Sequence, residues 1–177
     1  MSENVSLRPV SADDLTLFDE VFSTVMGAGT FQWFGHSATG ALHRRFAETG
    51  LIDTDGGMLA VINADACVGR VEWFKSAWGR PETSQCWTIA AGVFPEYCRR
   101  GIGTAAQRLL AEYLFLHTRA VRIQAYTDCD NVAEQGALVN AGFVLEGVLR
   151  AAQWRQGGWH DLLIYSSLRY GTSAEQG

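Results

Sequence analysis

The sequence has little positive charge and almost no lysine. It contains 14 Lys and Arg residues against 19 Asp and Glu residues, which gives a net charge of −5, and Lys75 is its only lysine. A nucleic-acid-binding surface requires a basic face, so this composition argues against a nucleic-acid partner. An acidic protein is better matched to cationic molecules such as amines.

Long apolar runs and paired cysteines are also absent. Residues 1–14 contain no apolar core of signal-peptide length, and no stretch approaches the ~18 apolar residues of a membrane span. Cys67, Cys86, Cys98 and Cys129 form no C-x-x-C pair and have no histidine at ligand spacing, so we expect neither a zinc site nor a disulfide scaffold. We therefore expect a cytoplasmic protein in a reducing compartment, with no bound metal and no membrane partner.

A segment rich in glycine and arginine, residues 95–106, is the most informative part of the chain. It reads Pro-Glu-Tyr-Cys-Arg-Arg-Gly-Ile-Gly-Thr-Ala-Ala and joins a predicted strand to a helix whose apolar residues recur at helical spacing. The first N–H groups of a helix have no partner within it and bind phosphate well. Gly101 and Gly103 allow close approach of the backbone, and Arg99 and Arg100 can add charge-assisted hydrogen bonds. The segment therefore predicts an anion site.

Three kinds of phosphate site are known to use a glycine-rich turn between a strand and a helix, and we compared the segment with each. Residues 101–106 match the dinucleotide fingerprint G-x-G-x-x-[GA], but six residues separate Phe94 from the first glycine, which directly follows the strand in a Rossmann unit. A Walker loop is excluded because no glycine is followed by Lys-Ser or Lys-Thr. The third possibility is the diphosphate carried by an acyl thioester.

Downstream motifs favour the third possibility and indicate a family. They are D-x-x-N-x-A at 128–133, A-G-F-x-x-E-G-V-L-R at 141–150 and W-x-D-x-x-x-Y-S-x-L-R at 159–169. With P-E-Y-x-x-R-G-I-G-T at 95–104, they resemble the GNAT superfamily of N-acetyltransferases, and within it the ribosomal-protein N-terminal (RimJ/RimL-like) branch. The resemblance is strong over the last half of the chain, returns at residues 6–14 and is weak between them.

The resemblance implies the mixed α/β (α+β) GNAT acyl-CoA N-acyltransferase fold, with a central, mostly antiparallel twisted sheet flanked by helices. We expect one domain over residues 1–170 and a flexible tail over 171–177. The sequence pattern predicts strands at 5–9, 58–62, 68–75, 88–94, 121–127, 143–154 and 159–168, helices at 11–25, 43–49 and 103–117, and a short helix ending at Asn140.

The resemblance further implies acetyl-CoA as the co-substrate. The strand before the glycine turn should splay from its neighbour, so that pantetheine pairs with backbone groups near 92–94 and one N–H faces the oxyanion. Gly92 fits a β-bulge there, or a glycine needed only for close packing. Asn131 would bind the pantetheine amides, although helix capping alone also explains it. The expected CoA-binding residues are Gly92, Val93, Phe94, Cys98, Arg99, Arg100, Gly101, Ile102, Gly103, Thr104 and Asn131.

Three positions depart from the family pattern. Cys98 stands where relatives usually have Arg or Gln, and Leu138 stands where many have a tyrosine that reprotonates the thiolate. Glu134 occupies the place of a serine found in some close relatives. The resemblance therefore supports an acyl-CoA site and leaves the acid unassigned.

Amine acylation requires removal of a proton from the acceptor, and two glutamates are candidate bases. Glu72 lies in the predicted strand 68–75, where a solvated strand face would explain it equally well. Glu146 belongs to the family-like segment in which relatives hold an acid beside the acceptor, and an ion pair with Arg150 or Arg155 is the alternative. A chain of water molecules is a third possibility.

The acceptor site is expected between residues 27–37 and the final hairpin. Aromatic residues there would form a pocket or a cation-binding wall, although core packing explains them equally well. These residues are Phe31, Trp33, Phe34, Trp154 and Trp159.

We predict an acyl-CoA-dependent N-acyltransferase that moves acetyl to a primary amine by direct attack. The acceptor would be a peptide or protein N-terminal α-amine, or a small-molecule amine such as an amino acid or an antibiotic. A CoA-binding sensor or partner module that has lost catalysis is the alternative from another class, and a nicotinamide enzyme ranks third. The final strands can also pair across a homodimer.

Overall fold

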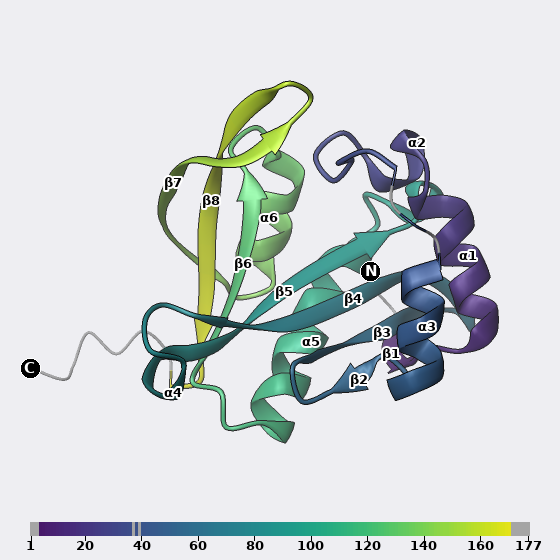
Figure 1. Ribbon diagram of the computed structural model, residues 1–177, viewed down its shortest axis with the longest axis horizontal. Helices are drawn as coiled ribbons and strands as arrows, with labels where there is room; N and C mark the ends of the chain where they lie inside the picture. The colour runs from purple at the N-terminus through teal and green to yellow at the C-terminus, as the bar shows by residue number, and fades with distance from the viewer. Residues whose placement is uncertain (1–3, 37, 39, 171–177) are drawn as a thin grey trace, which may run out of the picture.

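One sheet of eight strands runs through the molecule, and helices cover its two faces (Figure 1). The computed structural model describes residues 4–36, 38 and 40–170, so the tail predicted at 171–177 lies outside the described residues. The strand order is β1-β3-β4-β5-β6-β8-β7, with β2 paired to β3, and only β5 and β6 run parallel. The structure thus confirms the mixed, mostly antiparallel architecture. The strands are β1 (Val5–Pro9), β2 (Ile52–Asp53), β3 (Gly56–Asn63), β4 (Ala66–Ala77), β5 (Gln85–Val93), β6 (Arg122–Asp128), β7 (Val144–Arg155) and β8 (Gly158–Leu168).

The first helix begins where the sequence predicts and ends earlier. The Ser11 hydroxyl accepts a hydrogen bond from the Asp14 N–H, and the Asp14 carboxylate accepts one from the Ser11 N–H at 2.7 Å, which forms a capping box. The helix stops at Phe22 instead of residue 25, because the Thr24 side chain caps a separate short helix. The helices are α1 (Ala12–Phe22), α2 (Val25–Ala28), α3 (Gly40–Thr49), α4 (Pro81–Ser84), α5 (Ile102–His117) and α6 (Val132–Asn140). Within the described residues, no helix has the length and apolar character needed to cross a membrane.

Two hydrophobic cores lie on opposite faces of the sheet. Along β3, Leu59 and Val61 belong to the core under α5, whereas Met58 and Ala60 belong to the core under α1. This alternation explains why β3 reads as a nearly continuous apolar run, since both of its faces are covered. Figure 1 shows α1 and α3 on one side of the sheet and α5 on the other.

The strand before the glycine turn separates from β6, as predicted. β5 pairs with β4 along its length, whereas its pairing with β6 in the described chain is confined to Trp87↔Ile123 and Thr88↔Gln124. Beyond these pairs the two strands diverge, which Figure 1 shows clearly. The backbone of residues 89–93 therefore keeps a free edge toward β6.

The β-bulge predicted at Gly92 is absent, because the register between β4 and β5 does not shift. A Cβ atom at Gly92 would lie 3.0 Å from Cζ of Phe22. Close packing against the ring therefore explains this glycine, which faces the α1 side of the sheet.

Candidate active site

A groove of about 570 Å³ lies at the head of α5, between the free edge of β5 and helix α6. We call it the helix-head groove. It contains many of the residues predicted from the glycine-rich segment, together with residues of α6 that were not predicted. It is lined by Ala91, Val93, Tyr97, Cys98, Arg99, Gly101, Gly103, Thr104, Asn131, Val132, Ala133, Glu134, Gly136, Ala137 and Asn140.

The head of α5 has the geometry of an anion site. Gly101 is the N-cap at φ +76°, a left-handed conformation that favours glycine, and it has no side chain to cap the helix. The first bond of the helix runs from the Ala105 N–H to the Gly101 carbonyl at 3.0 Å, so the N–H groups of residues 102–104 have no partner within the helix. The positive end of the helix dipole lies behind them.

Gly103 shows that the cradle has room for a ligand. A Cβ atom there would meet only Cγ2 of Val93, at an ordinary contact distance of 3.8 Å. Protein packing therefore does not demand a glycine at this position. A ligand that approaches the backbone closely would demand one.

Three predicted CoA-binding residues have side chains outside this groove. Phe94 is 3 % exposed in the core under α1, and its N–H donates to the Val68 carbonyl at 2.8 Å. The Arg100 guanidinium lies over the Tyr97 ring, 5.4 Å from its centre. The side chain of Ile102 is buried in the other core, so only its backbone N–H faces the cradle. The sequence predicted mainly backbone contacts with CoA here, so contact of Gly92, Phe94, Arg100 and Ile102 with a ligand stays a prediction.

Asn131 has the capping role that was weighed as its alternative explanation. Its side-chain oxygen accepts a hydrogen bond from the Glu134 N–H at 3.3 Å, which caps α6. Asn131 also lines the helix-head groove, so contact with a ligand stays a prediction.

Glu134 is the acidic residue of this groove, and the sequence did not single it out as functional. Burial raises the pKa of its carboxyl to about 7, against the opposing effect of a hydrogen bond with Gln107. Leu138, one turn further along α6, is fully buried in the core and has no group that donates a proton. Leu138 thus offers no acid at the position where many relatives have a tyrosine, whereas Glu134, one turn earlier, has a carboxyl with a raised pKa.

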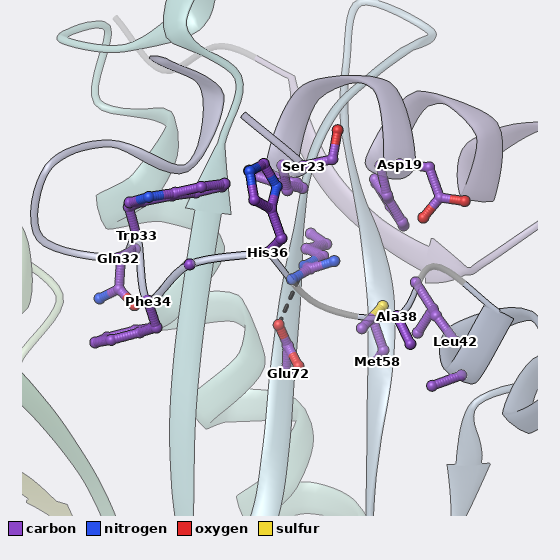
Figure 2. Close-up of a pocket in the computed structure, with 15 residues that line it drawn as sticks. Asp19, Ser23, Gln32, Trp33, Phe34, His36, Ala38, Leu42, Met58 and Glu72 are labelled. Atoms are coloured by element: carbon purple, nitrogen blue, oxygen red, sulfur yellow. Dashed lines mark ion pairs between the residues drawn. The ribbon is translucent and has the colours of Figure 1, made fainter. Parts of the chain in front are cut away.

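A second groove, of about 480 Å³, lies between α1, α3 and the strands β3 and β4 (Figure 2). We call it the aromatic groove. It combines aromatic rings with acidic and basic side chains. It is lined by Phe18, Asp19, Phe22, Ser23, Gln32, Trp33, Phe34, Gly35, His36, Ala38, Ala41, Leu42, Met58, Arg70 and Glu72.

The two grooves lie on opposite faces of the sheet. Paired residues of antiparallel strands point to the same face, and Glu72 pairs with Ala90. Ala91 and Val93, which line the helix-head groove, therefore point away from Glu72. β5 leaves β6 just after Thr88, so the edge of β5 that lies between the two faces is unpaired beyond this residue.

Glu72 lies on the wall of the aromatic groove, one strand away from the free edge of β5. Its Oε1 atom pairs with Nε of Arg70 at 3.1 Å, the interaction marked by the dashed line in Figure 2. The Arg70 guanidinium rests over the rings of Phe18 and Phe22, 5.7 and 4.6 Å from their centres. These contacts hold the Glu72 carboxylate at the groove, and its role as the base stays a prediction.

Glu146 does not have the environment of a base. Its two carboxylate oxygens accept hydrogen bonds from Arg122 at 2.7 and 2.5 Å, and Ser166 donates a third at 2.6 Å. These bonds, foremost those of Arg122, lower the pKa of Glu146 from 4.5 to about 2. Glu146 lines neither groove, and its ion pair forms with Arg122 instead of Arg150 or Arg155. These contacts favour a structural ion pair, and a role for Glu146 as the base stays an untested prediction.

The ion pair predicts a pH-dependent stability. Because folding lowers the pKa of Glu146, its contribution is complete above pH 4.5 and is lost as the pH falls toward 2. We expect Glu146→Gln to destabilise the fold by about 0.5–1 kcal/mol at pH 7, since the pair is partly solvent-screened. Thermal unfolding followed by circular dichroism should show this gap closing as the pH falls from 4.5 toward 2. A gap of equal size at pH 7 and 2 would contradict the assignment.

A buried arginine ties the final hairpin to the loop after α2. Arg155 is 4 % exposed, and its Nη2 atom pairs with the equally buried Asp128 at the end of β6. Its Nη1 atom donates to the Thr30 carbonyl at 3.0 Å, and its guanidinium lies 5.3 Å from the centre of the Phe31 ring. Figure 1 shows the tip of the hairpin beside this loop. Arg155 therefore fixes the segment that leads into the aromatic groove.

The aromatic residues predicted to bind the acceptor divide into two groups. Trp33 and Phe34 line the aromatic groove. Phe31 packs against Arg155 instead. Trp154 and Trp159 contact each other edge to face at 5.6 Å near the end of the hairpin, where they are 56 % and 64 % exposed. These last three residues do not line the aromatic groove, and their contact with an acceptor stays a prediction.

Metal chemistry finds no support in the arrangement of side chains. Over the residues that the structure describes, no three His, Cys, Asp or Glu side chains come together in a way that would hold a metal ion. The four cysteines are free thiols. The helix-head groove provides the anion cradle and the unpaired edge of β5. The aromatic groove, on the opposite face of the sheet, provides the carboxylate of Glu72.

Comparison with known proteins gives a family model and similar structures. The model described as acetyltransferase (GNAT) domain matches residues 4–144. No curated protein sequence matches the chain.

Among solved structures, the spermidine N-acetyltransferase of Vibrio cholerae, in complex with CoA and spermine, has a TM-score of 0.79 at 17 % identity, covering 94 % of this chain and 96 % of that one. The ribosomal-protein α-N-acetyltransferase RimL, in complex with CoA, has a TM-score of 0.77 at 13 % identity, covering 94 % and 95 %. RimJ of Mycobacterium smegmatis, in complex with CoA-disulfide, has a TM-score of 0.76 at 20 % identity, covering 98 % and 85 %. At these identities the likeness is one of fold.

Proposed function

We propose that this chain, which belongs to the GNAT acetyltransferase family, transfers an acetyl group from acetyl-CoA to a primary amine by direct attack. The observation that carries the proposal is the pair of grooves on opposite faces of the sheet, separated by the split between β5 and β6. Such an arrangement lets two substrates meet without a covalent intermediate on the enzyme. We infer that the helix-head groove takes the thioester and the aromatic groove takes the amine.

The residues of the helix-head groove fit CoA. Its pyrophosphate would accept hydrogen bonds from the N–H groups of residues 102–104, and Arg99, which lines the groove, would add positive charge. Pantetheine would pair with the free backbone edge of residues 89–93, and Asn131 would contact its amides. Acetyl-CoA supplies the activated acyl group in this chemistry. The CoA complexes of the spermidine acetyltransferase and RimL, which share the fold, support this assignment.

The aromatic groove suits a cationic acceptor. Trp33 and Phe34 offer ring faces that attract an ammonium group, and Asp19 and Glu72 add negative charge. The structural neighbours include enzymes named for spermidine and for ribosomal proteins, so both small amines and peptide α-amines are reasonable acceptors. The RimJ/RimL-like motifs lead us to rank a peptide α-amine first and a small amine second.

Glu72 is the residue that we assign as the base. An amine must be neutral before it attacks, so a carboxylate beside the acceptor can take its proton. Glu72 lines the aromatic groove, and its neighbour Ala90 on β5 lies where the free edge begins. An N–H of this edge would then donate to the oxyanion.

This assignment predicts the effect of one substitution. Glu72→Gln should lower kcat about 100-fold, because the amide cannot accept the proton, while the affinity for acetyl-CoA should stay unchanged. Steady-state thiol release and calorimetric titration would measure the two quantities. Glu146→Gln is a matched control from another strand and should keep the wild-type kcat. A Glu72→Gln enzyme with full kcat would refute the role.

A panel of acceptors tests the function itself. The protein and acetyl-CoA are incubated with peptides bearing free N-termini, polyamines, aminoglycosides and amino acids, and released thiol is measured. We expect release with at least one amine. Tight binding of acetyl-CoA without release over the whole panel would favour a CoA-binding sensor instead. Retention on a nicotinamide-dinucleotide column but not on a CoA column would favour a nicotinamide enzyme.

Several coarser expectations from the sequence stay predictions. A single domain over residues 1–170 and a cytoplasmic location are proposed on composition, and the free thiols are compatible with a reducing compartment. A homodimer is proposed because the edge strand β7 exposes about half of the side chains of Val144, Leu145 and Val148. Native mass measurement would decide the oligomeric state.

A further inference from the structure

Arg70 places a positive charge in the groove that we assign to the amine. Among the described residues that line the aromatic groove, it is the only arginine or lysine, and it lies beside the carboxylates of Asp19 and Glu72. Oε1 of Glu72 lies 3.1 Å from Nε of Arg70, the pair marked in Figure 2. Oδ2 of Asp19 lies 2.7 Å from Nε2 of His43. Both carboxylates of the groove thus have basic partners, whereas a site that selects a polycation needs uncompensated negative charge.

The guanidinium of Arg70 is held by aromatic rings and keeps two donor groups free. It lies over the Phe22 ring, 4.6 Å from its centre, and over the Phe18 ring at 5.7 Å. The N–H groups of a guanidinium lie in its plane, so stacking on a ring leaves them available for hydrogen bonds. Within residues 4–36, 38 and 40–170, Nη1 and Nη2 of Arg70 donate to no acceptor. We call these two groups the outer fork of Arg70.

The outer fork has the geometry and charge that a carboxylate requires. A planar guanidinium and a planar carboxylate form two parallel N–H···O bonds, and such charge-assisted bonds are the strong ones in proteins. The Arg70 side chain is only 24 % exposed, so water competes for the fork less than it would at an open surface. A phosphate, which carries up to two negative charges, is less well matched to one guanidinium beside two carboxylates.

The outer fork also lies close to the residue that we assign as the base. Arg70 and Glu72 are two residues apart on β4, so their side chains point to the same face of the sheet. Nε of the same guanidinium pairs with Glu72. A carboxylate on the outer fork would therefore hold the rest of a small acceptor within reach of Glu72.

We propose that the acceptor carries a carboxylate a few bonds from its amine, and that the outer fork of Arg70 binds this carboxylate. The inference rests on the proposed function and names the acceptor more closely. Two kinds of molecule have this chemistry, a free amino acid and a peptide whose first residue is aspartate or glutamate. Binding of the carboxylate directs the amine toward Glu72, and the rings of Trp33 and Phe34 line the same groove. A polyamine lacks the group that the fork binds.

Matched acceptors test the proposal through thiol release from acetyl-CoA. Free amino acids are compared with their α-carboxamides, and the amidated peptide Asp-Ala-Ala is compared with Asn-Ala-Ala. Spermidine serves as an amine without a carboxylate. We expect kcat/KM of the acid to exceed that of its amide at least about tenfold in one of the two comparisons, because the amide loses a charge-assisted pair with a partly buried guanidinium. The comparison that shows the difference identifies the acceptor as a free amino acid or as a peptide.

Substitution of Arg70 tests whether this side chain causes the preference. The ratio of kcat/KM between acid and amide is taken within each enzyme, so an effect on Glu72 that is common to both acceptors cancels. The ratio should fall to about one in Arg70→Met, chiefly through a higher KM for the acid. Arg70→Lys should keep a small part of it, because lysine has the charge but not the fork. Arg150→Met, which changes an exposed arginine outside both grooves, should keep the wild-type ratio.

The outcomes separate this inference from the proposed function. Acid-to-amide ratios near one in the wild type, or spermidine as the best acceptor, would overturn the inference and leave the proposed function intact. A wild-type preference that persists in Arg70→Met would overturn the role of the fork. Calorimetric titration with CoA shows which variants are folded, and Arg70→Lys gives the comparison if Arg70→Met is not. No thiol release with any acceptor would overturn both the inference and the proposed function.

Discussion

Arg155→Met is expected to lower the free energy of unfolding by about 3–5 kcal/mol. The substitution keeps an unbranched apolar stem but removes the guanidinium that pairs with Asp128, which is 4 % exposed. Asp128 would keep only the Asp130 N–H at 2.8 Å and the His160 ring at 3.6 Å, so its buried charge would be poorly compensated, and the Thr30 carbonyl also loses its donor. Urea unfolding would measure the change.

The control for this prediction is Arg150→Met, which changes an exposed arginine of the same strand and should alter stability by less than about 0.5 kcal/mol. Adding Asp128→Asn to Arg155→Met should recover part of the loss, because the stranded charge is gone. Equal stability of Arg155→Met and wild type would show that the ion pair contributes little. At temperatures where Arg155→Met is folded, its KM for the acceptor should rise while its affinity for CoA is unchanged, since Arg155 holds the loop that leads to Trp33 and Phe34.

Gly103→Val is expected to weaken CoA binding about 100-fold. The added side chain would keep the pyrophosphate away from the N–H groups of residues 102–104, and the loss of two hydrogen bonds to a charged group is of this size. Stability should change little, because a Cβ atom at Gly103 meets only Val93 at 3.8 Å. Calorimetric titration would give the affinity and thermal unfolding the stability.

Gly147→Val is the matched control, because a Cβ atom at Gly147 meets nothing within 4 Å and the residue lies outside both grooves. It should bind CoA as wild type does. Wild-type affinity in Gly103→Val would place the phosphates away from the head of α5. Reduced affinity in both variants would point to a general effect of valine on the fold.

The anion cradle was predictable because its determinants are local. The glycines, the change from strand to helical spacing and the absence of a capping side chain at Gly101 all lie within a few residues. The position of Glu72 followed from the period of two along one strand, which fixes the face of a side chain once the strand is known. The bulge at Gly92 was a poorer inference, because the ring of Phe22 that explains this glycine comes from another element.

The contacts that the sequence did not reveal are those of side chains whose partners are distant in sequence. Glu146 meets Arg122 only because β7 and β6 both pair with β8, which no local pattern reveals. Phe31 packs on Arg155 because a loop and a hairpin from opposite ends of the chain meet. Glu134 was noted as a departure, but its burial against α5 depends on how two helices pack. Such contacts depend on how distant elements pack together, so local sequence patterns could not predict them.

A crystal structure of the protein with CoA tests the central claim most directly. The account predicts that pyrophosphate oxygens lie about 3 Å from the backbone nitrogens of residues 102–104, with pantetheine along the free edge of β5. Phosphates bound at any other place, with the head of α5 in contact with solvent alone, would contradict it.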